Sequence, residues 1–577
     1  MSEEIEKIKG ERKKWEEKVI KPSLDRFGLK ESPNRFYCPA DLENFDFLTD
    51  VGFPGQYPFT AGTYAVIPYR PALRGSMPGG SGLVRAATYS GYGTAEDTRD
   101  YYMQMQKLGQ RGGPNLAFDL PSQCGYDSSN PMVRGEVGKT GVAVDTLRDF
   151  EIIYEPFQGD LNLDRIASNY TINAPANIIL AMYFALAEKR GISFDKLRAT
   201  PQNDILKEFV ARGTYIFPPG PSMRMVRDSI VFITKYCPSM NINQLGGYHI
   251  RQAGATRAQD LAFSMANLIA YIKEGIRAGL DVDEFVPRFT VNSFGGSMEF
   301  FKEIAFQRAA RRMWAKILKE RFGAKKERTL LLRAGLHANM GNENCTVQRP
   351  LNNITRAVVG AIASALSGGM PIVYPPYDEA LGLGWSMEAS QLAQDGARIL
   401  QYEAKLTEVL DPLAGSYHIE SLTNEIESAA WDDLNKIEAM GGAVVAIENG
   451  YMQREIAKGA YERQKRIENG EDLIVGVNCF VGEDELEVMT TRLVPHPYDP
   501  EKREKAEEKQ IQNLMVVNSI RDNHAVSKLL NDLRVKAKDE NENLIPTFIE
   551  CAKAYVTLQE MCDVLRDIFG EYQPIAL

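Results

Sequence analysis

The chain has 577 residues, with 67 Lys and Arg against 77 Asp and Glu, so its formal net charge is −10. An acidic balance without a basic stripe argues against a nucleic-acid-binding protein. With 44% apolar and 25% charged residues, the composition excludes a disordered or disulfide-stapled chain, and the length predicts several domains or one large α/β barrel with additions.

Neither a leader nor a membrane segment is indicated. The N-terminal sequence MSEEIEKIKGERKKWEE is charged and lacks the apolar core of a signal peptide. The most apolar stretch, 172–187, is interrupted by Asn173, Pro175 and Asn177 and is too short to span a bilayer. Seven scattered cysteines without CxxC spacing, and only five histidines, predict reduced thiols and no metal site. We therefore expect a cytoplasmic protein without a membrane or nucleic-acid partner.

Three regions follow one another along the chain. Residues 1–45 form a charged helix and a Pro-containing stretch, an N-terminal arm that either contacts a partner subunit or is a frayed terminus. In residues 46–410 short strand-like runs alternate with longer helices, which predicts an α/β fold and, over this length, a closed (β/α)8 TIM barrel. Residues 411–577 are mainly helical and are expected to form a C-terminal linker region. The predicted strands are 116–120, 165–172, 241–249, 288–293, 329–336 and 369–374, and the predicted helices include 260–278 and 297–322.

The predicted strands are unusually polar. They read ASNYTIN, NINQLGGYH and RFTVNS, whereas barrel interiors are normally filled by Val, Ile and Leu. Two explanations stay open. These segments are strand ends or loops, or something polar passes along the axis of the barrel.

The C-terminal region carries helix signals. Thr423 is a candidate N-cap for a helix that ends at Gly441-Gly442, and Thr557 with Glu560 has the spacing of a capping box. A charged, Pro-containing stretch at about 495–510 is expected to be a linker or an exposed loop. The apolar stripe of the first helix is formed by Leu422, Ile426, Ala430, Leu434 and Ile437.

Two glycine-rich segments look like phosphate loops but lack the required residues. Residues 135–140, GEVGKT, have Val133 where the motif needs its first Gly. Residues 74–82, RGSMPGGSG, lack the Lys-Ser/Thr pair, so a substrate-facing loop or a plain linker fits better. A nucleotide-binding phosphate loop is therefore not expected.

A set of longer segments is more informative. Together they resemble the large, substrate-binding part of methylmalonyl-CoA mutase and its relatives, in the same order from about residue 57 to 569. QNDILKEF followed by an Arg is highly specific. The segments are YPFT (57–60), AFDL (117–120), GYD (125–127), QNDILKEF (202–209) with Arg212, GYH (247–249), AGAT (253–256), PLNN (350–353), DEA (378–380), DP (411–412), GSY (415–417) and GVN (476–478).

The resemblance implies a fold and a chemistry. Members of this family have a (β/α)8 barrel whose axis is threaded by the pantetheine chain of coenzyme A, which would account for the small polar strand residues. Their active site lies where the barrel meets a cobalamin-binding domain. Adenosylcobalamin supplies a radical that abstracts hydrogen from the acyl-CoA substrate, whose carbon skeleton then rearranges. The protein binds, orients and shields the substrate.

Three residues match family positions at the reacting centre. His249 resembles the His that hydrogen-bonds the thioester carbonyl, although a lone His is more often structural. Tyr89 matches the Tyr that contacts the substrate carboxylate and the cofactor. Arg212 matches the Arg that pairs with the free carboxylate of a malonyl- or succinyl-type group, for which its planar fork is suited. The alternatives without a catalytic role are that Tyr89 is an exposed loop residue and that Arg212 is a surface residue of a helix.

Further residues fall near family positions around the substrate and cofactor. Gln202 resembles a Gln close to the thioester. Glu379 and Gln348 fall near the adenosyl group of the cofactor. The acyl-CoA channel would be lined by Tyr64, Arg85, Thr200, Arg288 and Thr290.

Departures from the family pattern bear on the substrate. Residues 288–293 read RFTVNS where methylmalonyl-CoA mutases read RLSFFW, so the segment has two fewer large aromatic side chains and space should open. Leu73–Gly82 is an insertion, and Pro121-Ser-Gln123 replaces Ala-Thr-His. Retention of Tyr89 and Arg212 with an enlarged pocket predicts a carboxylate-bearing acyl-CoA with an alkyl or aryl substituent larger than that of methylmalonyl-CoA. An ordinary methylmalonyl-CoA mutase large subunit is the alternative.

The cobalamin-binding signature Asp-x-His-x-x-Gly has one near match, Asp522-Asn-His-Ala-Val-Ser527, which lacks the Gly, so we interpret His524 as a surface residue. The resemblance therefore implies a separate small cobalamin-binding subunit, a heterotetramer of two large and two small chains, and in some relatives a GTPase chaperone. Two other classes remain as alternatives: a non-catalytic partner subunit of a mutase, and a CoA-binding module without radical chemistry. The presence of all four residues Tyr89, Gln202, Arg212 and His249 favours a catalytic large subunit.

Overall fold

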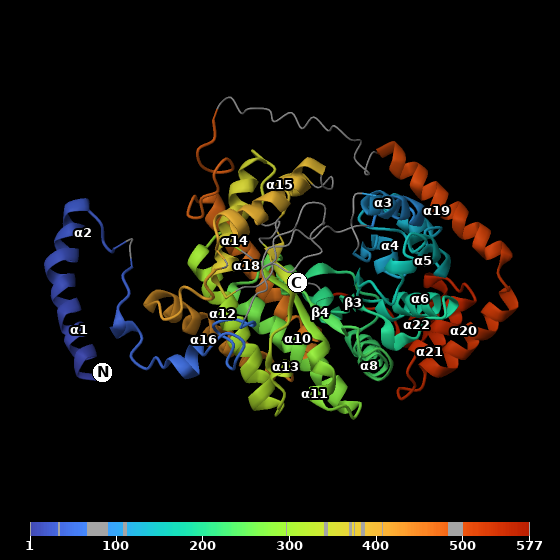
Figure 1. Cartoon of the computed structure of the whole chain (residues 1–577), viewed down its shortest axis with the longest axis horizontal. Helices are drawn as coiled ribbons and strands as arrows, with labels where there is room; N and C mark the ends of the chain where they lie inside the picture. The colour runs from blue at the N-terminus through green and yellow to red at the C-terminus, as the bar shows by residue number, and fades with distance from the viewer. Residues whose placement is uncertain are drawn as a thin grey trace.

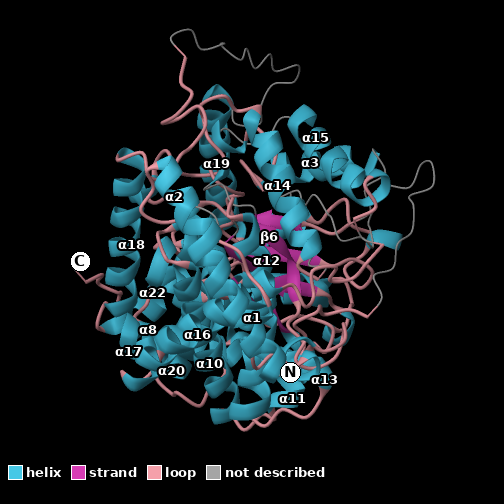
Figure 2. Ribbon diagram, turned by 90° about the vertical axis from the view of Figure 1, so that its left-hand side faces the viewer, coloured by secondary structure: helices cyan, strands magenta, loops and turns pink. Residues whose placement is uncertain are grey.

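The fold belongs to the α/β class, as the sequence predicts. A computed structural model describes residues 2–32, 35–65, 91–107, 112–295, 297–339, 344–368, 372–373, 375–381, 387–406, 408–482 and 500–575 (Figure 1). Parallel strands lie at the centre and helices surround them, with β6 enclosed between helices in Figure 2.

The described strands are all parallel and lie side by side in chain order. Two backbone hydrogen bonds join the sheets, from the Gln244 N–H to the Gln202 carbonyl oxygen (2.8 Å) and from the Asn241 N–H to the Ala199 carbonyl oxygen (2.9 Å). Helices connect successive strands, as parallel pairing requires. One sheet holds β1 (Asn115–Ala117), β2 (Ser168–Thr171) and β3 (Ala199–Pro201), and the other holds β4 (Asn243–Leu245), β5 (Phe289–Gly295), β6 (Ala334–Asn339) and β7 (Ile372–Val373).

The helices around the strands differ in how much of their surface is buried. Helix α6 has no charged residue before its last turn and is buried from Ala176 to Ala187, which explains the apolar stretch noted in the sequence. Among the described helices, none has the length and apolar character needed to cross a membrane. The helices of this part are α3 (Ala95–Lys107), α4 (Leu120–Gln123), α5 (Leu147–Ile153), α6 (Ala176–Lys189), α7 (Ile205–Lys207), α8 (Pro219–Tyr236), α9 (Gly247–Gln252), α10 (Arg257–Arg277), α11 (Val282–Phe285), α12 (Phe300–Lys316), α13 (Glu327–Leu330), α14 (Asn352–Leu366) and α15 (Met387–Arg398).

The C-terminal helices share a continuous apolar core with the α/β part, from Phe59 to Leu565. Helix α16 packs on α10 and α12, where buried Arg308 pairs with Asp411 and Glu420. Helices α19 to α22 lie along the side formed by α3 to α6 (Figure 1). These helices are α16 (Tyr417–Ala439), α17 (Ala443–Glu448), α18 (Tyr451–Glu468), α19 (Pro500–Ile520), α20 (Asn523–Ala537), α21 (Ile545–Lys553) and α22 (Leu558–Phe569).

A buried acid cluster, Asp119, Asp145 and Asp149, anchors α19. The Gln510 side-chain amide donates to Asp145 (2.8 Å) and Asp149 (3.0 Å) from a position that is itself buried. Burial raises the pKa of Asp119 to about 7, of Asp145 to about 6 and of Asp149 to about 7, because a carboxylate is poorly solvated there. The cluster therefore favours protonated carboxyl groups in the folded chain.

The N-terminal arm stands away from the body of the molecule (Figure 1). It consists of α1 (Ser2–Trp15), a π-helical turn and α2 (Lys21–Phe27), and neither the turn nor α2 buries a residue. The Arg12 guanidinium tethers α1 through a 2.9 Å ion pair with Asp41.

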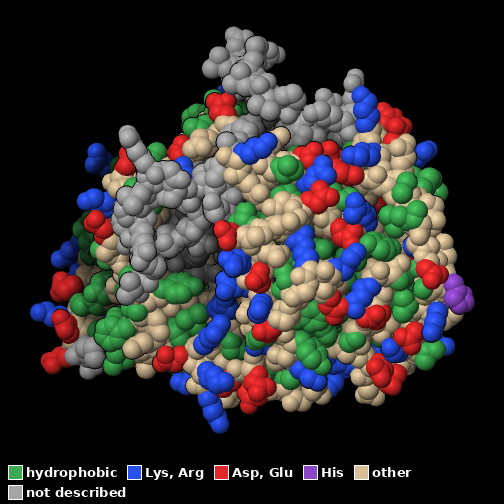
Figure 3. Space-filling view, turned by 45° about the vertical axis from the view of Figure 1, so that its right-hand side comes forward, with side chains coloured by type: hydrophobic (Ala, Val, Ile, Leu, Met, Phe, Trp, Pro, Cys, Tyr) green, Lys and Arg blue, Asp and Glu red, His purple; other side chains and the backbone are tan. Residues whose placement is uncertain are grey.

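Cationic and anionic side chains are interspersed on the face of the molecule drawn in Figure 3.

Most predicted elements are confirmed, with shifted bounds. Five of the predicted strands overlap β1, β2, β4, β5 and β6, the helices at 260–278 and 297–322 correspond to α10 and α12, and the five stripe residues of α16 are buried. The strand at 369–374 lies partly outside the described residues and its described part is β7. The Thr557–Glu560 capping box is present at α22, and His524 is exposed.

Four expectations were wrong. His249 lies on α9 rather than in a strand, because Gly246-Gly247 ends β4 and the helix starts there. Residues 329–330 belong to α13, and residues 500–510 are helical rather than a loop. Thr423 is inside α16, which begins at Tyr417, and its hydroxyl donates to the Ile419 carbonyl oxygen (2.7 Å).

Candidate active site at the carboxyl ends of β3 and β4

Two polar segments meet at the same edge of the parallel strands. Gln202 follows β3 directly and leads into α7 and the π-helical turn Glu208–Arg212. His249 lies on α9, which follows β4. Because β3 and β4 are parallel neighbours, the segments after their carboxyl ends lie together, which is where ligands bind in α/β folds.

Glu208 is the centre of a buried polar network. Its carboxylate accepts hydrogen bonds from the Asn173 amide (2.6 Å) and from the Thr214 N–H (3.1 Å) and hydroxyl (2.5 Å), and it pairs with the Lys207 ammonium. Burial works against its ionisation, but Lys207 and Arg212 outweigh it and hold its pKa below the usual value. Glu208 is therefore an ionised, fully partnered carboxylate inside the protein.

Arg212 is the least constrained charge in this network. One of its nitrogens lies 3.4 Å from Glu208, and 27% of its side chain is exposed. No described residue holds the rest of its planar fork. A guanidinium in this position can bind a carboxylate in two places.

His249 presents an imidazole beside these cations. Its ring lies against Tyr248, with 3.9 Å between centroids, and its Nδ1 is buried without a hydrogen-bond partner among the described residues. Burial, followed by the charges of Lys207 and Arg212, lowers its pKa well below the usual value. His249 is therefore neutral at physiological pH and has hydrogen-bonding capacity left for a ligand.

The predicted channel residues follow the strands from one end to the other. Arg288 directly precedes β5 at its amino end and donates to the Thr234 carbonyl oxygen (3.4 Å). Thr200 lies on β3, where its hydroxyl accepts from the Asn241 amide (2.8 Å), and Thr290 on β5, where its hydroxyl donates to the Asn243 carbonyl oxygen (3.0 Å).

Tyr64 lies beside Arg333, which precedes β6. Burial, followed by the charge of Arg328, lowers the pKa of Arg333, and Tyr64 is near enough to act on it in the opposite direction. Burial, followed by the charge of the same Arg328, also lowers the pKa of Arg288 at this end of the strands. This end therefore concentrates positive charge, about one strand length from His249.

The two residues expected near the cofactor lie in loops after β6 and β7. Gln348 is exposed, and Glu379 begins a single turn, Glu379–Leu381. Burial and then Glu379 raise the pKa of Cys345 to about 11, which places these loops side by side. Tyr89 and Arg85 lie outside the described residues.

Three network members were missed in the sequence: Asn173, Lys207 and Glu208. Lys207 and Glu208 lie within the motif QNDILKEF, and an adjacent Lys-Glu pair directly after a strand is a signal that could have been used. Arg333, immediately before β6, was also missed, and a charged residue next to a strand is an equivalent signal. Asn173 has no such signal, because only the fold brings it to Gln202.

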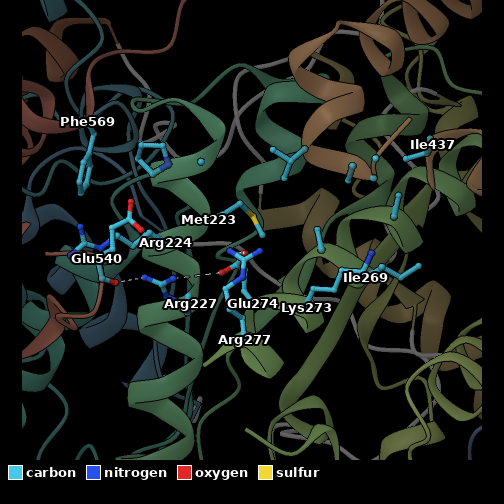
Figure 4. Close-up of a pocket in the computed structure, with 18 of the residues that line it drawn as sticks. Met223, Arg224, Arg227, Ile269, Lys273, Glu274, Arg277, Ile437, Glu540 and Phe569 are labelled. Atoms are coloured by element: carbon cyan, nitrogen blue, oxygen red, sulfur yellow. Dashed lines mark hydrogen bonds and ion pairs between the residues drawn. The ribbon is translucent and has the colours of Figure 1, made fainter. Parts of the chain in front are cut away.

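A separate cavity of about 720 Å³ lies away from these strand ends, among α8, α10, α17, α20 and α22 (Figure 4). Its arginines already have partners. Arg224 donates to the Ala537 carbonyl oxygen (2.5 Å), and Arg227 lies 4.0 Å from Glu274. The cavity therefore marks where the C-terminal helices dock on α8. Among the described residues, no three His, Cys, Asp or Glu side chains gather so as to hold a metal ion.

Comparison with known proteins identifies the family. The profile described as methylmalonyl-CoA mutase matches residues 30–571. The chain is 37% identical to the 2-hydroxyisobutanoyl-CoA mutase large subunit of Aquincola tertiaricarbonis over 575 residues, 98% of this chain and 97% of that protein. It is 36% identical to methylmalonyl-CoA mutase of Rhizobium meliloti (93% of this chain, 71% of the relative) and to the mitochondrial enzyme of Homo sapiens (90% and 66%). The chain belongs to the methylmalonyl-CoA mutase family.

Family membership defines the class of enzyme. The family and the relatives named above are coenzyme-B12-dependent acyl-CoA mutases, which are isomerases, and the chain is an enzyme of this class. The chain spans nearly all of the Aquincola large subunit but only about two thirds of the human mutase.

Proposed function

We propose that the chain is the large, substrate-binding subunit of an adenosylcobalamin-dependent mutase acting on a carboxylate-bearing acyl-CoA. The observation that carries this proposal is the network after β3 and β4, where a neutral His249 with an unpartnered Nδ1 lies near the open fork of Arg212. The His249 imidazole suits a thioester carbonyl, and the Arg212 guanidinium suits a carboxylate.

The strand arrangement supports a (β/α)8 barrel with the CoA chain along its axis. Seven described parallel strands follow one another in space in chain order, joined by the hydrogen bonds between β3 and β4. Small polar side chains, Thr200 and Thr290, lie on these strands between the cationic end and the His249 end. Phosphates of CoA would meet Arg288 and Arg333, and the acyl group would reach His249.

In this mechanism the protein binds and orients. When bound, adenosylcobalamin supplies a carbon-centred radical that removes hydrogen from the substrate. Gln202 and His249 hydrogen-bond the thioester carbonyl oxygen, and a neutral imidazole can do so without giving up a proton to the substrate. Arg212 binds the distal carboxylate. The substrate is then held at both its thioester and its carboxylate while its carbon skeleton rearranges, and the site excludes water.

The residues around the cofactor divide between two chains in this proposal. Glu379, half-buried and near Cys345 in the loops after β6 and β7, provides carboxylate oxygens that can accept from ribose hydroxyls of the adenosyl group. The near match to the cobalamin signature, Asp522–Ser527, lacks the Gly of that motif. We assign the adenosyl contacts to this chain and the cobalt ligand to a small cobalamin-binding partner.

An apolar patch next to these loops is a candidate surface for binding the small subunit. Segment 473–481 meets α14, where the Arg356 guanidinium donates to the Val475 carbonyl oxygen (2.9 Å) and to the Thr346 hydroxyl (2.8 Å) of the loop after β6. Phe480 is 80% exposed, an unusual environment for a large apolar side chain. The patch is formed by Val347, Leu351, Leu473, Val475, Phe480 and Val481. The Aquincola relative is itself named a large subunit, which favours a small subunit as the occupant.

The N-terminal arm is proposed as a second interface, between the two large chains of a heterotetramer. Its α2 buries nothing in the chain itself, and Phe27 and Phe36 are exposed. We divide the chain into this arm (1–45), the acyl-CoA-binding barrel (46–410) and the helical linker region (411–577). A GTPase chaperone is a candidate further partner of the assembled enzyme in this proposal. All seven cysteines are unpaired, which is consistent with the proposed cytoplasmic location.

A second candidate substrate class is favoured by one comparison. The Aquincola relative is named for 2-hydroxyisobutanoyl-CoA, which carries no second carboxylate. The open fork of Arg212 favours a dicarboxylic acyl group instead, because its one contact, with Glu208, is long and leaves most of the guanidinium free to bind a second carboxylate. The two fewer aromatics in residues 288–293 relative to methylmalonyl-CoA mutases favour an alkyl or aryl substituent.

A substrate panel tests the proposal. The chain would be combined with its small subunit and adenosylcobalamin and offered succinyl-CoA, isobutyryl-CoA, 2-hydroxyisobutyryl-CoA and alkyl- and aryl-substituted succinyl-CoA. Isomerisation would be followed by mass-resolved chromatography. Best turnover of a substituted succinyl-CoA is expected, and best turnover of succinyl-CoA would indicate an ordinary methylmalonyl-CoA mutase. Turnover of the carboxylate-free thioesters alone would refute the role of Arg212.

A further inference from the structure

Lys207 is a fully buried lysine that the proposed reaction does not itself require. Its ammonium has three N–H donors and no acceptor. Two of the donors are used, one on the Gln202 side-chain oxygen (2.8 Å) and one on Glu208. Burial lowers the pKa of Lys207, and Glu208 opposes that shift. A buried charge placed against a substrate-facing amide requires an explanation beyond packing.

The two bonds to the Gln202 oxygen determine which way its amide points. The Asn173 side-chain nitrogen donates to the same oxygen (2.9 Å), and Asn173 is itself oriented because its oxygen accepts from the Asp204 N–H (2.9 Å). A flipped Gln202 would turn its NH₂ group toward two donors, which is unfavourable. The amide nitrogen therefore points away from Lys207, and no described residue accepts a hydrogen bond from it.

Lys207 also lies next to His249. A Cβ built on Gly246 would be 3.4 Å from Lys207 Cε and 3.6 Å from His249 Nδ1, so both side chains flank the same glycine. The lysine charge disfavours imidazolium at this position. Two neutral groups, the Gln202 amide and the His249 imidazole, are thus left beside one buried cation.

We propose that Lys207 is a positioning residue that holds the Gln202 amide with its N–H donors toward the thioester carbonyl of a bound acyl-CoA. The inference rests on the proposed function, because it requires an acyl-CoA at this site. Glu208 does not depend on Lys207, since it keeps Asn173, Thr214 and Arg212 as donors when the lysine is removed. Loss of Lys207 would leave Asn173 as the single described donor to the Gln202 oxygen, and would so weaken the preference of the amide for the orientation that presents its N–H donors to the carbonyl.

The test uses two ligands that differ only in the carbonyl. Binding of isobutyryl-CoA and of its thioether analogue S-isobutyl-CoA to the full-length chain would be measured by calorimetry, without cofactor. The wild-type chain should prefer the thioester. Lys207→Met should reduce this preference by about tenfold, the value of one hydrogen bond to a carbonyl. Lys302→Met, which changes an exposed lysine on α12, is the matched control and should leave the preference unchanged.

A double-mutant cycle separates positioning from a purely structural role. Gln202→Ala should lose the same preference for the thioester. Adding Lys207→Met to Gln202→Ala should not change the preference further, since both substitutions remove the same hydrogen bond to the carbonyl. Equal weakening of both ligands by Lys207→Met, or an unchanged preference, would refute the positioning role. If the wild-type chain binds neither ligand, the proposed function itself fails.

A second variant keeps the lysine in place. Gln202→Glu retains an oxygen for Lys207 and Asn173 but replaces the outward donor by an acceptor. Its expected result is a preference for the thioether over the thioester. A Gln202→Glu chain that still prefers the thioester would show that the outward amide donor does not meet the carbonyl, and would overturn the proposal even if Lys207→Met does not fold.

Discussion

The open fork of Arg212 gives the sharpest prediction. Its contact with Glu208 is long at 3.4 Å, and Glu208 has four other donors, so Arg212→Gln should change the stability of the chain by less than about 1 kcal/mol. A carboxylate bound by the fork would form two charge-assisted hydrogen bonds, each contributing about 1.5–3 kcal/mol. Because 27% of the side chain is exposed, we take about 3 kcal/mol for the pair.

This energy corresponds to a roughly hundredfold loss of kcat/KM on succinyl-type substrates. Isobutyryl-CoA, which lacks the carboxylate, should change less than about threefold. The assay is steady-state isomerisation with the small subunit and adenosylcobalamin. Arg165→Gln, which alters an exposed arginine paired with exposed Asp160, is the control. A loss below tenfold on succinyl-type substrates, or an equal loss on both classes, would show that Arg212 does not bind the carboxylate.

The remaining predictions concern the core, the acid cluster and the apolar patch. Arg308→Met removes the cation that pairs with two buried carboxylates and should lower the free energy of unfolding, measured with denaturant, by about 3–5 kcal/mol. The control Arg321→Met, whose pair with Glu438 is partly exposed, should lower it by less than about 1 kcal/mol. Because the pKa values of the acid cluster are raised in the folded state, the folded chain binds more protons than the unfolded chain between about pH 4 and 7. The unfolding temperature measured by calorimetry should therefore fall as the pH rises through this range. Asp145→Asn should make this dependence on pH less steep. Phe480→Asp should weaken small-subunit binding at least tenfold in calorimetry without changing acyl-CoA binding, and unchanged subunit affinity would exclude the patch as the interface.

The sequence predicts the α/β class and most long elements because their signals are local. The helix α10 has a capping box at Thr256 and a continuous apolar face, and both can be read from neighbouring residues. The strand β3 was missed because Ala199–Pro201 is three residues long and includes a proline, so its pairing with β2 and β4 exists only in the folded chain.

The site divides in the same way. Gln202, Arg212 and His249 were found because they lie in motifs that resemble a family, but the motif alone placed His249 in a strand. Its position on α9 follows from two glycines that end β4 and allow the chain to turn. The buried partners of these residues were found only in the structure, because contacts such as that between Asn173 and Glu208 join residues 35 positions apart.

The substrate class follows from how the network distributes charge. Glu208 is ionised and fully partnered, and the same carboxylate meets Lys207 and Arg212. Lys207 is buried against Glu208 and the Gln202 oxygen, so Arg212, with 27% of its side chain exposed, is the cation of this network that a ligand can reach. Its guanidinium therefore favours an anion at the open side. A dicarboxylic acyl-CoA supplies that anion, whereas an isobutyryl-type thioester would leave the guanidinium with its long contact to Glu208 alone.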